Sequence, residues 1–218
     1  MKKAGILSMQ RIYNYGSFLQ AYALKKMMEE CGAEVEFVDY HPGECILPSK
    51  ETTGMKRKIQ KGLEILRIKG RLRDKIQFVK YKKNYARKNY PVLGPKETYN
   101  YAPKLDLLVI GSDEVFNCIQ DNSNVGFAPE LFGAGHQANR LISYAASFGN
   151  TTLESLKKYQ VADQVAQWLR AFDALSVRDE NSRKIVQELI GKDPVCHLDP
   201  VLAYDYPAKL PETKAKIP

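Results

Sequence analysis

The sequence lacks the features that mark membrane-spanning, secreted and metal-binding proteins. No run of about 18 apolar residues occurs in it, which argues against a membrane-spanning helix. The apolar stretch from Ala4 to Leu7 is too short for the core of a signal peptide, so we predict a cytoplasmic protein. The four cysteines form no Cys-x-x-Cys pair and the three histidines are dispersed, so neither a metal site nor a redox motif is predicted. A Gly-x-Gly-x-x-Gly fingerprint and a Walker loop are also missing, and no cofactor is predicted.

Basic residues are concentrated in one segment. The chain has 33 lysines and arginines against 25 acidic residues, a net charge of +8. Fourteen of the basic residues lie between Met55 and Asn89, where only two acids oppose them. A basic segment with tyrosines is typical of nucleic-acid binding or of attraction to an anionic membrane, and it also fits a solvated helical face. We favour the solvated face, expect no nucleic acid, and keep peripheral contact of residues 56–88 with the inner membrane face as a hypothesis.

Short apolar strands alternate with helical patterns along the chain. Residues 4–8 form a predicted strand, followed by an amphipathic helix that runs to Glu30 with Ser17 as its N-cap and Gly32 beyond its end. Further strands are predicted over 34–39, 105–110, 141–147, 174–177 and 195–198, and helices over 152–171 and 179–190. This alternation predicts an α/β fold, a doubly wound Rossmann-like parallel sheet with helices on both faces.

The same pattern defines the domain organisation. We expect one Rossmann-like domain over residues 1–205, interrupted at about 54–90 by a basic helical insertion between the second and third strands. Ile76 and Val79 are predicted to belong to an apolar stripe of that insertion. Residues 206–218 are rich in proline and lysine, and we interpret them as a linker or a truncated end.

Polar residues follow the predicted strands at the points where ligands bind in open α/β sheets. Ligands bind in such sheets outside the carboxyl ends of the strands. The residues that we predict to converge there and bind substrate are Asn14, Tyr15, Gly16, Ser17, Gly111, Ser112, Asp113, Ser147, Arg178 and Asp199. None of them is assigned as a catalytic acid or base.

Each of these residues also has a simpler structural interpretation. Gly16 with Ser17, and residues 111–113, fit ordinary turns and helix caps. A guanidinium at the position of Arg178 suits a bidentate grip on phosphate or carboxylate, or equally a salt bridge. The acidic partners available to it are Asp179, Glu180 and Asp199. His197, inside a predicted strand, is interpreted as a buried, hydrogen-bonded histidine.

Five blocks, read together and in order, resemble the polysaccharide pyruvyl transferase family. They are IYNYGSFLQAYAL at 12–24, LLVIGSDEVFN at 107–117, ISYAASFG at 142–149, SVRDENS at 176–182 and LDPVL at 198–202. Glu114 and Phe116 are conservative departures from the family's GSDQ-W-N segment. Any one of these blocks alone would be weak support for the family. Five blocks in the correct order make the resemblance specific.

The resemblance implies both a fold and a reaction. It implies the N-terminal half of a two-domain transferase similar to the GT-B type, with the active site between the domains. The donor would be phosphoenolpyruvate, the acceptor a glycan, and the product a pyruvyl ketal. Arg178 would hold the donor's phosphate or carboxylate, while Asn14, Gly16, Ser112 and Asp113 would line the acceptor side. Relatives continue into a second α/β half with an arginine–histidine motif, so we expect these 218 residues to be inactive alone.

Two other functions remain open at the level of sequence. A GT-B-like glycosyltransferase or sugar-nucleotide binder would use the same cleft. A non-catalytic module could instead bind nucleic acid or a membrane through its basic segment, with affinity that falls steeply with salt.

Overall fold

Every strand of the central sheet runs in the same direction. The computed structural model describes residues 1–47, 72–94 and 98–206. Its strands are β1 (Lys2–Leu7), β2 (Ala33–Val38), β3 (Lys104–Asp113), β4 (Gln137–Ala146), β5 (Ser176–Val177) and β6 (Val195–Cys196). They pair in parallel in the order β2-β1-β3-β4-β5-β6. The direction of winding reverses between β1 and β3, which is where a doubly wound sheet binds its ligand.

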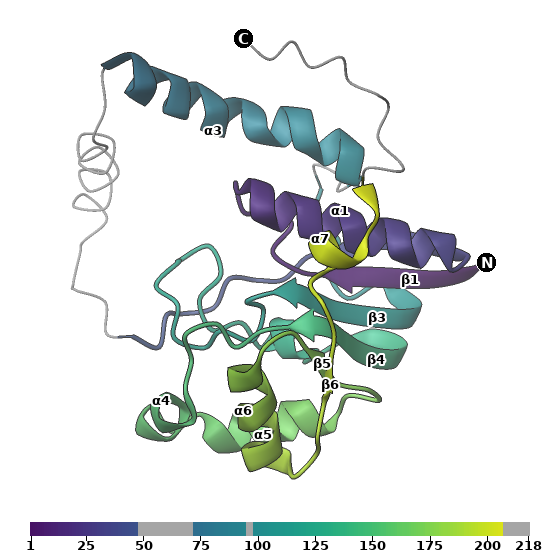
Figure 1. The fold of residues 1–218 in the computed structure, drawn as a ribbon, viewed down its shortest axis with the longest axis vertical. Coiled ribbons are helices and arrows are strands. Elements are labelled where there is room, and N and C mark those ends of the chain that lie inside the picture. Colours follow the sequence, from purple (N-terminus) through teal and green to yellow (C-terminus); the bar gives the residue numbers. More distant parts are fainter. Residues whose placement is uncertain (48–71, 95–97, 207–218) are drawn as a thin grey trace.

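Helices cover both faces of this sheet, as Figure 1 shows. On one face lie α1 (Tyr15–Glu30), α3 (Leu72–Leu93) and α7 (Pro200–Ala203), and on the other lie α4 (Leu153–Lys158), α5 (Ala162–Arg170) and α6 (Glu180–Ile190). A short 3-10 helix, η1, spans Pro129–Phe132. The arrangement confirms the predicted doubly wound α/β fold.

Alternation along the strands divides the apolar side chains between two cores. Successive side chains of a strand point to opposite faces, so Ile6 of β1 packs against Ala21 and Leu24 of α1 while Leu7 faces the other core. The core that contains Leu7 is the larger of the two. It also contains Phe116, whose ring centroid lies 4.9 Å from that of Phe132. Burial of these side chains is the main stabilising contribution to the sheet and its helices.

Helix α1 begins three residues earlier than the sequence predicts. Asn14 is its N-cap, because the side-chain oxygen of Asn14 accepts a hydrogen bond from Gly16 N at 2.8 Å. The prediction of Ser17 as N-cap is therefore wrong: Ser17 lies within the first turn, and its hydroxyl bonds elsewhere. The end was predicted correctly, since the helix stops before Gly32, whose φ of +85° is left-handed.

The helix predicted over 152–171 is two helices. α4 ends at Lys158 and α5 begins at Ala162, with Gln160 between them at a left-handed φ of +57°. That conformation cannot continue a helix, so the chain turns before α5. Helix α6 follows the prediction, with Asp179 as N-cap and Gly191 as a left-handed C-cap.

Helix α3 lies in the segment that we expected to be a basic insertion. Its Tyr85 and Leu93 are buried, whereas Ile76 is exposed and does not join an apolar stripe as predicted. Residues 48–71, with the first seven of the basic residues, and the side chain of Val79 lie outside those described. In the described part of the chain, no helix combines the length and the hydropathy that crossing a bilayer requires.

Candidate functional site

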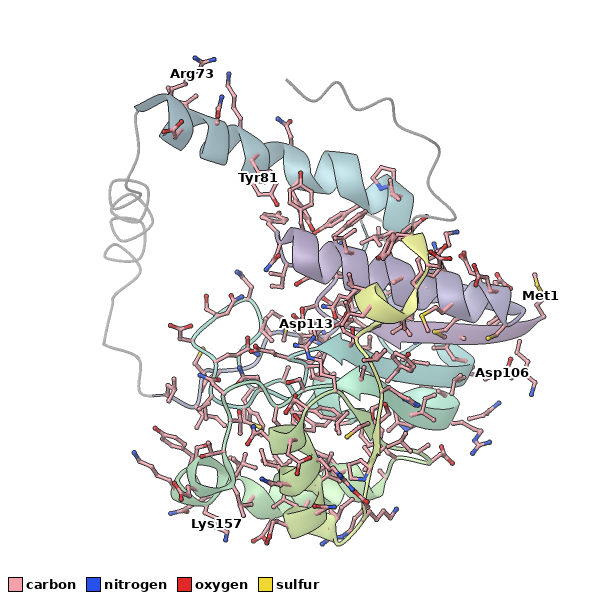
Figure 2. All side chains as sticks on the ribbon, in the orientation of Figure 1. Met1, Arg73, Tyr81, Asp106, Asp113 and Lys157 are labelled. Atoms are coloured by element: carbon pink, nitrogen blue, oxygen red, sulfur yellow. The ribbon has the colours of Figure 1, made fainter. Side chains whose placement is uncertain are left out.

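Four predicted residues meet where the winding of the sheet reverses. Ser17 comes from α1, Asp113 from the end of β3, Arg178 from the residue after β5, and Asp199 from the N-cap of α7. Figure 2 labels Asp113 at the carboxyl end of the sheet, where the ends of β1 and β3 adjoin the start of α1. We call these four residues the Asp113 cluster.

Asp113 is the centre of the cluster. Its Oδ2 accepts a hydrogen bond from Ser17 Oγ at 2.8 Å, and its Oδ1 accepts one from Glu114 N at 2.9 Å. The same Oδ1 lies 3.8 Å from Arg178 Nη2. Asp113 has a φ of +83°, a left-handed conformation that few residues other than glycine adopt. Such conformations are held where the surrounding structure fixes them, and they concentrate at functional sites.

Arg178 forms a salt bridge with one of its three candidate partners. Its Nη1 donates to Asp199 Oδ2 at 2.7 Å, and Asp199 Oδ1 accepts from Val201 N at 2.9 Å. The other two candidates are directed elsewhere: Asp179 caps α6, and Glu180 lies near Arg183 and Lys184. The salt-bridge interpretation is thus confirmed for Asp199. A guanidinium has five N–H donors, so the bridge leaves donors with which Arg178 can bind an anion.

Ser17 and Gly111 are buried, and so are two other predicted residues, Ser112 and Ser147, whose hydroxyls serve the framework. Ser112 is fully buried, donates to Gln20 Oε1, and accepts at its carbonyl from Ser8 Oγ. Ser147 is also buried, and its Oγ donates to Asp179 Oδ2 at 2.7 Å. Both hydroxyls tie helices to strand ends, and neither is presented to a ligand in this structure.

Gly111 allows two strands to approach closely. A β-carbon at this position would lie 2.3 Å from the carbonyl oxygen of Tyr144 in the neighbouring strand, and its φ is +129°. Only glycine fits without displacing backbone atoms. Its role is therefore to shape the end of β3 before Asp113.

The remaining predicted residues form an exposed rim. Asn14, Tyr15 and Gly16 are all exposed at the start of α1. The carbonyl of Asn14 accepts a hydrogen bond from Tyr85 of α3 at 2.7 Å. Burial raises the pKa of the Tyr85 hydroxyl above its ordinary value, which already keeps a tyrosine protonated at neutral pH. Helix α3 is thereby attached to the rim, a contact that sequence reasoning missed because it joins residues 71 positions apart.

His197 differs from its predicted environment. It is exposed, although it is hydrogen-bonded as predicted, with Nδ1 2.7 Å from Ser176 Oγ. Its ring also stacks on Tyr144 with centroids 5.1 Å apart. The prediction of burial is wrong because β6 is the edge strand of the sheet and leaves this side chain uncovered.

A separate cavity of about 410 Å³ lies against the core on the side of the sheet away from α1. Its lining includes Leu7, Leu108, His41, Tyr101 and Glu130, and no member of the Asp113 cluster. His41 stacks on Tyr101 at 3.9 Å and bonds to Glu130 at 3.0 Å. Within residues 1–47, 72–94 and 98–206, no group of three or more His, Cys, Asp or Glu side chains is placed to hold a metal ion.

Among models of known protein families, the one described as polysaccharide pyruvyl transferase matches the chain over residues 14–217. The matched range contains the whole Asp113 cluster. A search of curated proteins and a search of solved structures returned no significant match.

Proposed function

Because the chain belongs to the polysaccharide pyruvyl transferase family, we propose that it takes part in the transfer of a pyruvyl group from phosphoenolpyruvate to a sugar of a cell-surface polysaccharide. The Asp113 cluster carries this proposal. It brings one guanidinium, two carboxylates and a hydroxyl to the reversal point of a doubly wound sheet, a place where polar ligands bind.

The reaction defines what such a site must supply. Protonation of the methylene carbon of phosphoenolpyruvate makes the adjacent carbon electrophilic, and a sugar hydroxyl adds to it. A second hydroxyl of the same sugar then displaces phosphate, and each hydroxyl loses its proton as its bond forms. The products are a cyclic ketal and inorganic phosphate. This chemistry needs a general acid, a base, and cations for the donor's phosphate and carboxylate.

The residues divide by charge between donor and acceptor. We assign Arg178 to the donor, because a guanidinium binds phosphate or carboxylate bidentately. Asp113 suits the acceptor, since a carboxylate accepts hydrogen bonds from sugar hydroxyls. The buried Ser17 positions Asp113 by donating to its Oδ2. Asp199 positions Arg178 through its 2.7 Å hydrogen bond.

The net charge of the cluster supports the proposal that residues outside it are needed to bind the anionic donor. Two aspartates and one arginine sum to −1 when ionised, which opposes the binding of a multiply charged anion. The family's second α/β half, with its arginine–histidine motif, would supply the missing positive charge. We therefore propose that residues 1–218 alone do not complete the reaction.

Calorimetry with phosphoenolpyruvate tests the donor assignment. The 218-residue chain and the longest natural product of the gene are each titrated, as are Arg178→Ala variants of both. Binding is expected in the longer form and at least tenfold weaker in its Arg178→Ala variant. Arg183→Ala is the matched control, because Arg183 lies on α6 and pairs with Asp193, which is not a member of the cluster.

Other outcomes of the titration redirect the assignment. Equal binding by wild type and Arg178→Ala would remove Arg178 from the donor site. Absence of binding by every folded form would contradict the donor itself, and UDP- and GDP-sugars would then be titrated to test the glycosyltransferase alternative.

Peripheral membrane contact at the cytoplasmic face remains a separate proposal. Of the basic residues between 56 and 88, Arg73 and Lys80 are exposed on α3, and the first seven lie outside the described residues. Sedimentation with vesicles containing phosphatidylserine measures this contact. Binding that falls as salt rises from low ionic strength would support it, and failure to sediment at low salt would exclude it.

A further inference from the structure

The cavity of about 410 Å³ lies against three adjacent strands of the sheet. One side of it is formed by buried aliphatic residues of the larger core, Leu7 of β1, Val38 of β2, and Leu105 and Leu108 of β3. The facing side is formed by residues with small side chains, among them Ala102, Pro103, Pro129, Ala134 and Ala138. Protein interiors are normally close-packed, and the volume of this cavity lies within the range of small-molecule sites.

The rim of the cavity carries a carboxylate that is held in place. His41 stacks on Tyr101 with ring centroids 3.9 Å apart, and its Nδ1 lies 3.0 Å from Glu130 Oε1. Tyr101 is 41% exposed and the side chain of His41 is 66% exposed, so the cavity is open to solvent at this rim. In the part of the chain that the structure describes, the second oxygen of Glu130, Oε2, accepts no hydrogen bond, and a ligand can use it.

The charges of the lining favour a cation over an anion. Two carboxylates, Asp39 and Glu130, line the cavity, and no lysine or arginine does. Asp39 already accepts hydrogen bonds from Arg11 and from Asn100 N, which leaves Glu130 as the anionic group available to a ligand. A phosphate or carboxylate would lack a permanently cationic partner here, because His41 is charged only when protonated.

We propose that this cavity binds a small organic cation with an apolar body. The apolar part would lie against Leu7, Leu105 and Leu108, where burial of its surface stabilises the complex. Its ammonium group would donate a hydrogen bond to Oε2 of Glu130, which the contact with His41 already orients. The lining includes no member of the Asp113 cluster, so this inference goes beyond the proposed function and does not depend on it.

An NMR titration with three ligands of equal chain length tests the preference for a cation. Hexylammonium, 1-hexanol and hexanoate are each added near neutral pH to the longest natural product of the gene, labelled at its leucine, valine and alanine methyl groups. The methyl groups of Leu7, Val38, Leu108 and Ala138 report binding in the cavity. Hexylammonium is expected to bind about fivefold more tightly than hexanol, because a partly exposed charge pair contributes roughly that factor. Hexanoate should bind more weakly than both.

Three variants separate the charge of Glu130 from the shape of the cavity. Glu130→Gln keeps the size of the side chain and should lower the affinity for hexylammonium to that for hexanol, while the affinity for hexanol stays at the wild-type value. Ala138→Phe fills the cavity and should abolish the binding of both ligands. Glu154→Gln is the matched control, because Glu154 is an exposed acid of α4 that does not line the cavity.

The contrary outcomes are equally specific. Absence of shifts at the cavity methyl groups with all three ligands, in the folded wild type, would overturn the site. Binding of hexanol or hexanoate as tight as that of hexylammonium would overturn the cationic class, and so would an unchanged preference in Glu130→Gln.

A competition experiment keeps this inference distinct from the proposed function. Saturation with hexylammonium should leave the affinity for phosphoenolpyruvate unchanged, because the two ligands are assigned to separate sites. Competition between them would overturn that separation. Hexylammonium binding that depends on Glu130, in a protein that does not bind phosphoenolpyruvate, would support the cavity site while contradicting the donor assignment.

Discussion

Two arginine–aspartate pairs at the same edge of the sheet differ in how many hydrogen bonds the aspartate accepts and in how far it is exposed. Asp39, after β2, accepts from Arg11 Nε and Nη2 at 2.5 and 2.9 Å, from Asn100 N at 2.9 Å, and from Gln10 Nε2 at 3.3 Å. Its side chain is 4% exposed. Asp199 receives one hydrogen bond from Arg178 and is 23% exposed.

The difference separates a structural pair from a candidate binding pair. The Arg11 guanidinium also lies 4.3 Å from the ring centroid of Tyr99, so it is enclosed by a carboxylate and an aromatic face. Its pKa is raised above the ordinary value by the hydrogen bond to Asp39, which outweighs the opposing effect of burial. Arg178, in contrast, is 25% exposed, donates one hydrogen bond to Asp199 and lies 3.8 Å from Asp113.

The largest effect is expected from Asp39→Asn. This change leaves Arg11 beside a neutral group in a mostly buried position, and loss of one partner of such a pair costs about 3 kcal/mol. Urea unfolding followed by circular dichroism measures the free energy of unfolding. Asp121→Asn, at an exposed position, is the control and should be close to wild type. A loss below about 1 kcal/mol would show that the Asp39 pair is no more important than a surface salt bridge.

Asp199→Asn is expected to have a small effect on stability and an opposite effect on ligand binding. Arg178 and Val201 N bond to different oxygens of the carboxylate, so the single amide oxygen of asparagine can accept from only one of them. Because the pair is partly exposed, the free energy of unfolding should fall by only about 1 kcal/mol. Removing one negative charge next to Arg178 should tighten phosphoenolpyruvate binding several-fold in the longest natural form. Weaker binding would mean that the negative charge of Asp199 is needed to position Arg178.

The contrast between these pairs also shows what the sequence could predict. The β-α alternation fixed the sheet class, and the rule on strand ends correctly selected Ser17, Asp113, Arg178 and Asp199 as neighbours. The same rule also selected Ser112 and Ser147, because strand periodicity does not show which hydroxyls form hydrogen bonds with side chains distant in sequence. The Ser112 hydroxyl donates to Gln20, 92 residues away, and the Ser147 hydroxyl donates to Asp179.

Local signals failed where two candidates satisfied the same rule. Asn14 and Ser17 are both good N-caps, and the choice depended on Asp113, which binds the Ser17 hydroxyl from 96 residues away. The partner of Arg178 was ambiguous for the same reason. The nearest acid in sequence, Asp179, caps α6, which left the bridge to Asp199. The tyrosine contacts of α3 had no signal in periodicity, since they join two segments through their rings.

A third pair, Arg183 with Asp193, extends the comparison to the surface and gives the smallest expected effect. Two hydrogen bonds of 2.7 Å link them, and Asp193 is 56% exposed. Arg183 holds the pKa of Asp193 below its ordinary value of 3.8. A lowered pKa in the folded state stabilises the protein above the ordinary pKa, and this contribution disappears as the pH falls through the folded-state value.

Asp193→Asn should therefore slightly lower the melting temperature at pH 7, and the difference should vanish in strong acid. It should also shrink as salt is added at pH 7, because exposed charges are screened. A difference that persisted in acid would assign the effect to the hydrogen-bond geometry that Asn alters, and not to the charge of Asp193.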